Sequence, residues 1–177
     1  MARMKFLCDA ERCIECNACV TACKNENEVP WGVNRRRVVT INDGSPGERS
    51  MSVACMHCSD APCAAVCPVD CFYFTDDGVV LHDKDICIGC GYCAEWCPYD
   101  VPHLEVESVL TGKAKAAKCT FCQDRLQEGI GGPSCAERCP VGALTWGPRE
   151  TLLAQAQERV AALKTEGLSS ARVYGEV

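Results

Sequence analysis

Four groups of closely spaced cysteines constrain this chain of 177 residues more than any other feature, because they contain sixteen of its eighteen cysteines. The groups are Cys13, Cys16, Cys19 and Cys23; Cys55, Cys58, Cys63 and Cys67; Cys87, Cys90, Cys93 and Cys97; and Cys119, Cys122, Cys135 and Cys139. About one residue in ten is a cysteine, whereas only 6% are aromatic, so an apolar core of ordinary density is not expected. Disulfides or bound metals must supply the missing stability.

The beginning of the chain favours metals over disulfides. Residues 1–8, MARMKFLC, contain neither an apolar stretch of signal-peptide length nor twin arginines, and no run of about eighteen apolar residues predicts a transmembrane helix. We therefore expect a cytoplasmic protein, in which thiols stay reduced and disulfides are rare. The net charge of −6 argues against nucleic acid as the main partner. The one dense basic segment, residues 35–37, is interpreted as a solvated strand or loop edge in preference to a docking patch for an acidic partner.

The spacing within the groups predicts iron–sulfur clusters. The first and third groups read C-x2-C-x2-C-x3-C, a spacing typical of [4Fe–4S] proteins, and each of the last three groups is followed directly by proline. Three thiolates two residues apart can wrap one cubane, while the fourth begins a short helix and faces a second cluster. Paired C-x2-C motifs would also suit zinc, but zinc requires neither the third cysteine nor the proline.

The order of the groups predicts how they combine. Only nineteen residues separate Cys67 from Cys87, and apolar residues flank the Asp-Gly turn at 77–78, so a β-hairpin joins the second and third groups. A second hairpin is expected between residues 104–109 and 113–118. The first and fourth groups are left to pair across this insertion. We expect an α+β fold of two ferredoxin-like modules, one inserted in the other, with the outer module at 1–50 plus 105–147 and the inserted module at 51–104.

Residues 148–177 are expected to form a C-terminal amphipathic helix and a tail. Pro148 suits the first helical position, and Gly167 supplies the end of the helix. The apolar positions that recur at helical spacing are Leu152, Ala156, Val160 and Leu163. We expect this helix to pack on its own chain, and residues 171–174 to form a short strand.

Taken together, the motifs resemble those of the four-cluster electron-transfer subunits of molybdenum and tungsten oxidoreductases. These include the β subunit of formate dehydrogenases, the iron–sulfur subunits of dimethyl sulfoxide reductase-type enzymes and the electron-transfer subunits of tungsten aldehyde oxidoreductases. The matching segments span residues 13 to 147 in the order of the family: CIECNACVTACKNEN, CMHCSDAPCAAVCP, CIGCGYCAEWCPYDVP, KCTFCQDRL and CAERCPVGALTWG. The resemblance implies four [4Fe–4S] clusters that form a wire between an active site in another subunit and an electron acceptor.

The resemblance also implies a crossed set of ligands. One cluster would be held by Cys13, Cys16, Cys19 and Cys139, and another by Cys119, Cys122, Cys135 and Cys23. In the inserted module, one cluster would be held by Cys55, Cys58, Cys63 and Cys97, and another by Cys87, Cys90, Cys93 and Cys67. All sixteen positions are cysteine in this chain, so no cluster is expected to lack an iron.

The partners implied by the resemblance make the chain a non-catalytic member of a hetero-oligomer. A large molybdopterin- or tungstopterin-containing subunit would oxidise formate, an aldehyde or a similar low-potential substrate. Because this chain ends after an amphipathic helix, where membrane-anchored relatives carry a transmembrane helix, we expect a soluble acceptor or a flavin subunit that reduces NAD. A free-standing polyferredoxin and a zinc-binding interaction module are the alternatives, and the substrate and the partner's metal stay open.

Several residues near the four groups have expected roles other than ligation. Cys8 and Cys71 are interpreted as small buried hydrophobic residues. His57 lacks the second histidine that a two-iron Rieske centre requires, so it is expected to pack or to form a hydrogen bond. The cations that flank the fourth group either offset cluster charge or lie at the surface: Lys118, Arg125 and Arg138.

Overall fold

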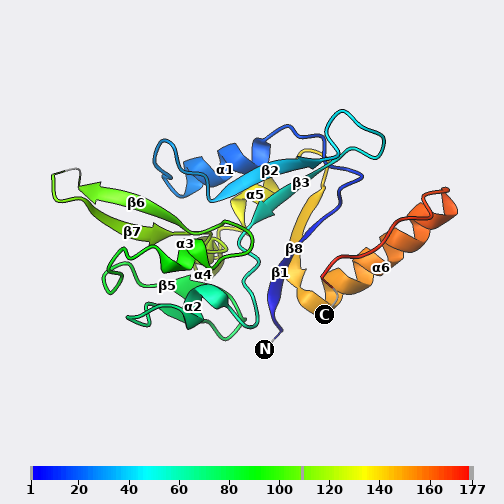
Figure 1. Ribbon diagram of the computed structural model, residues 1–177. Helices are drawn as coiled ribbons and strands as arrows, with labels where there is room; N and C mark the ends of the chain where they lie inside the picture. The colour runs from blue at the N-terminus through cyan, green and yellow to red at the C-terminus, as the bar shows by residue number, and fades with distance from the viewer. Residues whose placement is uncertain (1, 109, 176–177) are drawn as a thin grey trace.

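The computed structural model describes residues 2–108 and 110–175 as a mixture of short strands and short helices (Figure 1). In chain order these are β1 (Met4–Cys8), α1 (Ala18–Glu26), β2 (Arg36–Ile41), β3 (Arg49–Ala54), α2 (Pro62–Ala65), β4 (Phe72–Phe74), β5 (Val80–His82), α3 (Tyr92–Glu95), β6 (His103–Ser108), β7 (Lys113–Ala117), α4 (Gln123–Glu128), α5 (Ser134–Glu137), β8 (Leu144–Pro148) and α6 (Arg149–Thr165). The α+β class is therefore confirmed.

Within the described residues, the strands form four separate antiparallel pairs: β1–β8, β2–β3, β4–β5 and β6–β7. Both predicted hairpins are present. In β4–β5, Phe72 lies opposite His82, and the turn passes through Gly78 with a φ of 72°, which glycine adopts without steric cost. In β6–β7, Val106 lies opposite Ala114. Val109, the predicted end of the first strand of that hairpin, lies outside the described residues.

The pairing of β1 with β8 joins the two ends of the sequence. Phe6 lies opposite Trp146, and the amide of Arg149 donates to the carbonyl of Arg3 at 2.8 Å. Figure 1 shows β1 and β8 side by side although they lie near opposite ends of the colour scale. Helices α1 and α5, which follow and precede these strands along the chain, also pack against each other. The first and fourth cysteine groups are thereby brought to the same part of the molecule.

Cysteines account for much of the buried interior, as the composition indicates. One buried cluster consists of Cys71, Cys87, Cys93 and Ala116, and another of Cys19, Cys135 and Leu144. The largest aromatic group surrounds the fully buried Phe121, whose ring centre lies 4.4 Å from that of Phe6 and 6.4 Å from that of Trp146. These small clusters contain few aliphatic side chains, so they do not form an apolar core of ordinary density.

Helix α6 packs on its own chain, as predicted. It begins at Arg149, one residue later than expected, and buries Leu152 and Ala156 against β1 and β8. Arg159 reaches back to Asp9 with an Nε–Oδ2 distance of 2.9 Å. The helix ends before Gly167, whose φ of 101° suits glycine. Among the described residues, no helix is both long and apolar enough to cross a bilayer.

The predicted short strand at residues 171–174 is wrong. These residues adopt no regular structure, and the amide of Ala171 donates to the nearby carbonyl of Leu168 at 3.0 Å. A strand needs a neighbouring strand edge to satisfy its backbone groups. The tail instead satisfies this amide within a local turn.

Glu105 on β6 links the hairpin to two other segments. Its carboxylate is buried and accepts from Arg35 Nη2 at 3.3 Å and from Lys84 Nζ at 2.7 Å. Burial raises the pKa of the Glu105 carboxyl, but the hydrogen bond from Lys84 and the charge of Arg35 lower it by more. The pKa therefore lies below its ordinary value of 4.5. The stabilisation of the fold by the ionised Glu105 carboxylate is therefore complete above pH 4.5 and is lost as the pH falls through the lowered pKa.

We expect Glu105→Gln to lower the free energy of unfolding at neutral pH by about 2 kcal/mol, because the substitution leaves two cations without their anion. The thermal unfolding of the cluster-loaded chain measures this effect. Glu107→Gln, at an exposed position on the same strand, is the matched control and should change stability little. Equal unfolding temperatures for the two variants would contradict the prediction.

Candidate metal centres

Five cysteines line one cavity: Cys8, Cys13, Cys16 and Cys19 from the beginning of the chain, and Cys139 from the fourth cysteine group. Cys13 and Cys16 lie in the loop before α1, Cys19 lies in its first turn, and Cys139 follows α5. Asn17, with a φ of 57°, reverses the chain directly before α1 in the left-handed region that asparagine tolerates. Three cysteines of the first group and the last cysteine of the fourth group therefore face a common space.

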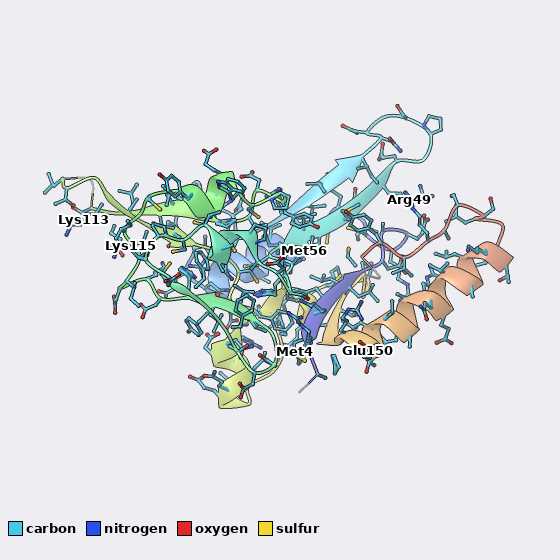
Figure 2. All side chains as sticks on the ribbon, turned by 60° about the horizontal axis from the view of Figure 1, so that its bottom comes forward. Met4, Arg49, Met56, Lys113, Lys115 and Glu150 are labelled. Atoms are coloured by element: carbon cyan, nitrogen blue, oxygen red, sulfur yellow. The ribbon has the colours of Figure 1, made fainter. Side chains whose placement is uncertain are left out.

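A second cavity is lined by five cysteines: Cys67, Cys71, Cys87, Cys90 and Cys93. The hairpin β6–β7 closes it: the amide of Ala116 donates to Cys87 Sγ at 3.4 Å. A Cβ at Gly89 would lie 2.1 Å from the carbonyl oxygen of Ala114, so only glycine allows the hairpin to approach this closely. Figure 2 shows Lys115 on the same hairpin, where its Nζ donates to the carbonyl of Cys87 at 2.7 Å.

A third gathering of thiols surrounds Cys63 of the second sequence group. The pKa of the Cys63 thiol is raised to about 11, and burial is the largest cause. Three neighbouring thiols contribute to this increase: Cys55, Cys97 and Cys58. Cys97 belongs to the third sequence group and the other three to the second, so this gathering also crosses between groups.

A fourth gathering of thiols surrounds Cys23 of the first sequence group. Burial raises the pKa of Cys23 to about 12, and the thiols that add to this shift are Cys119, Cys135 and Cys122. Burial likewise raises the pKa of Cys135 to about 12. Here Cys23 of the first sequence group joins three cysteines of the fourth.

The four gatherings are named by one member each. They are the Cys13 set (Cys13, Cys16, Cys19, Cys139), the Cys119 set (Cys119, Cys122, Cys135, Cys23), the Cys55 set (Cys55, Cys58, Cys63, Cys97) and the Cys87 set (Cys87, Cys90, Cys93, Cys67). Cys19 contributes to the raised pKa of Cys135, and Cys119 to that of Cys55. Helix α2, which carries Cys63, packs against α3, which carries Cys93. The neighbour relations therefore run from the Cys13 set through the Cys119 and Cys55 sets to the Cys87 set.

The chemistry of these donor sets fits a polynuclear metal cluster. Buried thiols close to one another do not ionise together unless a positive charge stabilises them, and iron supplies that charge to a thiolate. Among the described residues, no three cysteine, histidine or carboxylate side chains stand close enough together to chelate a single ion. A cubane takes one thiolate at each of its four irons, so its ligands stand further apart than those of one ion.

The comparisons with known proteins agree with this chemistry. Residues 49–149 match the family described as a 4Fe-4S dicluster domain. The chain is 48% identical to the formate dehydrogenase iron-sulfur subunit of Wolinella succinogenes, with 90% of this chain and 88% of the relative covered. It belongs to the iron–sulfur subunits of formate dehydrogenase and related molybdoenzymes. The resemblance recognised from the cysteine motifs is therefore confirmed.

Further members of the family match over most of this chain. The formate dehydrogenase-O iron-sulfur subunit of Escherichia coli is 35% identical over 95% of this chain. The match spans 61% of the length of that relative. The thiosulfate reductase electron transfer subunit of Salmonella typhi is 40% identical, with 80% of this chain and 74% of the relative covered. As a member of this family, the chain is a non-catalytic electron-transfer subunit of the [4Fe–4S] type.

One of the three cations that flank the fourth group is buried beside thiols in this iron–sulfur subunit. Lys118 is 1% exposed, and its Nζ lies 3.8 Å from Cys55 Sγ and donates to the carbonyl of Cys119 at 3.0 Å. Arg125 is instead paired with two carboxylates, and Arg138 is exposed. Lys118 therefore places a positive charge beside a thiol of the Cys55 set and next to the backbone of Cys119.

His57 has the hydrogen-bonding and packing role that was expected. Its Nδ1 accepts from the amide of Val80 at 3.1 Å, and its ring meets Phe121 edge-on. Burial and the charge of Lys118 hold the pKa of His57 well below its usual value, so the imidazole is neutral. Because Nδ1 accepts a hydrogen bond, the ring proton is on Nε2.

Cys8 and Cys71, the two cysteines outside the four groups, were interpreted as small buried hydrophobic residues. Both lie beside thiol sets. Cys8 lines the cavity of the Cys13 set, and Cys71 lines that of the Cys87 set. Cys71 donates from its amide to Cys67 Sγ at 3.4 Å, and the two sulfur atoms are also 3.4 Å apart. In the sequence, the four-residue interval between Cys67 and Cys71 is the only feature that indicates the position of Cys71 beside a thiol set. Cys8 reaches its cavity through the long-range pairing of β1 with β8.

Proposed function

We propose that the chain carries four [4Fe–4S] clusters, one in each thiol set, and relays electrons between a pterin-containing catalytic subunit and a second redox partner. The observation that supports this proposal is that cysteines of different sequence groups line common cavities or lie near enough to raise one another's pKa. Each set takes three members from one sequence group and one from another, which is the exchange of ligands known from two-cluster ferredoxins. When bound, the clusters supply one-electron redox chemistry, whereas the polypeptide supplies thiolates, burial and fixed charge.

The neighbour relations among the sets support a relay. The Cys13 and Cys87 sets stand at the two ends of the series, with the Cys119 and Cys55 sets between them. Cys16 and Cys90, one from each terminal set, are exposed, whereas Cys119 and Cys122 are buried. Terminal clusters at exposed positions would exchange electrons with partner subunits, and the buried set would pass them between the ends.

We further propose that the catalytic partner oxidises formate at a molybdopterin or tungstopterin site. This choice is supported by the relative that is 48% identical, which is a formate dehydrogenase subunit. Subunits of tetrathionate, thiosulfate and dimethyl sulfoxide reductases are 34–40% identical. A cytoplasmic hetero-oligomer that includes a flavin subunit able to reduce NAD remains part of the proposal.

The proposed organisation is an outer module of residues 1–50 plus 105–147 and an inserted module of residues 51–104. The pairing of β1 with β8 and the packing of α1 on α5 support the outer module, since both join its distant segments. Hairpin β6–β7 lies against the Cys87 set, so it contributes to the surroundings of the inserted module as well.

The test of this function is metal analysis of the full chain purified without oxygen. We expect about sixteen irons and sixteen labile sulfides per chain, because each of four cubanes contains four of each. A few zinc ions without sulfide would instead support an interaction module. Purification of the tagged chain from its native cells should also recover a large pterin-containing subunit. Recovery of a fully iron-loaded chain without such a partner would support a free-standing polyferredoxin.

A further inference from the structure

Arg36 is a buried cation without an acidic partner. It lies at the start of β2, is 3% exposed, and forms none of the ion pairs found within the described residues. The basic segment 35–37 was interpreted as a solvated edge, and for Arg36 this interpretation is wrong. A buried charge is costly unless other groups compensate it, so the surroundings of Arg36 have to provide that compensation.

The direct contacts of the guanidinium satisfy only part of its hydrogen-bonding capacity. Nη1 donates to Ser52 Oγ at 2.9 Å, and the guanidinium carbon lies 4.6 Å from the centre of the Phe6 ring, within the range of a cation–π contact. Nε and Nη2 are buried, and neither has a hydrogen-bond partner among the described residues. Two strong donors therefore face protein interior that offers them no acceptor.

The contact with Ser52 leads directly to the Cys13 set. Ser52 Oγ lies 3.2 Å from Cys19 Sγ. Because the hydroxyl oxygen accepts from Arg36, its own proton is available to the sulfur of Cys19. Cys19 and Ser52 both line the cavity of the Cys13 set. Arg36 thus reaches a proposed ligand through one hydroxyl group.

The Cys119 set lies close to the same charge. The Phe6 ring beneath the guanidinium packs against a buried cluster that contains Cys135 of the Cys119 set as well as Cys19 of the Cys13 set. An arginine side chain does not lose its proton in proteins. The permanently charged guanidinium therefore lies near members of both sets.

We propose that Arg36 bridges the clusters of the Cys13 and Cys119 sets and raises the reduction potential of both. It acts on the first through the Ser52 hydroxyl, and its free Nε–H and Nη2–H groups are available to acceptor sulfur at the cluster sites. This inference rests on the proposed function, because it requires clusters in these two sets. A fixed positive charge stabilises the reduced state, which is more negative than the oxidised state by one charge.

The experiment measures the midpoint potential of each cluster in the full, cluster-loaded chain by EPR-monitored redox titration. In Arg36→Gln we expect the ratio of reduced to oxidised cluster at a fixed potential to fall about tenfold for two signals, a shift of about 59 mV for a one-electron couple. Ser52→Ala should shift only the signal of the Cys13 set. A Cys23→Ser variant assigns the signals, because it alters the Cys119 set.

Arg49→Gln is the matched control, since it removes the same charge from the other strand of the hairpin at the outer end seen in Figure 2. Unchanged midpoints in Arg36→Gln, or equal shifts in Arg36→Gln and Arg49→Gln, would overturn the proposal. If Arg36→Gln loses iron, Arg36→Lys decides: retention of iron by the lysine variant supports a role for the charge, and equal loss indicates packing alone. An iron count in the unsubstituted chain that excludes four clusters would mean that the proposed function has failed.

Discussion

Substitution of Cys23 by serine is expected to alter the cluster of the Cys119 set and to leave that of the Cys13 set intact. Cys23 lies in α1, within the first cysteine group of the sequence, yet the thiols that influence it most belong to the fourth group. If Cys23 completes the Cys119 set, its loss acts across about a hundred residues of sequence. If each sequence group holds its own cluster, the same substitution acts locally.

EPR of the reduced protein separates these two arrangements. Cys23→Ser and a double variant that lacks Cys119 and Cys122 should lose or shift the same signal. Cys8→Ser is the control, because Cys8 lines a thiol-rich cavity but belongs to none of the four sets. It should keep about sixteen irons. Loss of two different signals in the Cys23 and Cys119/Cys122 variants would refute the crossed arrangement.

Removal of iron is expected to unfold the chain and to leave no folded apo form. The buried clusters consist largely of cysteines, and helices α2, α3 and α5 have only four residues each. Such short helices and isolated strand pairs are not stable by themselves in water. Bonds between iron and thiolate therefore replace much of the core, so that metal binding and folding are coupled.

NMR spectroscopy of the chain after anaerobic chelation tests this expectation. The amide signals should collapse into the narrow range of an unfolded chain, and addition of iron and sulfide should restore their dispersion. A thiol reductant has to be present throughout, so that disulfides formed by air do not cause the change. A well-dispersed spectrum of the reduced, cluster-free chain would show that the polypeptide folds without its clusters.

The elements that sequence reasoning predicted are those with local signals. The Asp-Gly turn at residues 77–78 indicates β4–β5, and the spacing of Leu152 and Ala156 indicates α6. Strands β1 and β8 were not predicted, because they lie far apart in the sequence and neither forms a hairpin with the strand next to it along the chain. The tail at 171–174 has the composition of a strand but pairs with none of the described strands.

The candidate site, like the fold, was predictable only where the signal in the sequence is local. Four cysteine groups are legible in the sequence, and the resemblance to a family implied how they exchange members. The environment of the sets was not predicted, and Arg36 shows why. Three consecutive arginines look uniformly solvated, but alternate side chains of a strand face opposite sides. Arg36 and Val38 therefore share the inward face of β2, whereas Arg37 turns to the carbonyls of Tyr99 and Asp100.

The pairing of β1 with β8 also has a consequence for biosynthesis. With the proposed ligands, the Cys13 set lacks its fourth member until the ribosome has translated Cys139, close to the final helix. During most of translation, the first thiols to emerge therefore have no complete site to occupy. The Cys13 set can then be completed only after Cys139 has been translated. Until that point, the unfinished polypeptide depends on a reducing environment or a chaperone to keep those thiols from oxidation.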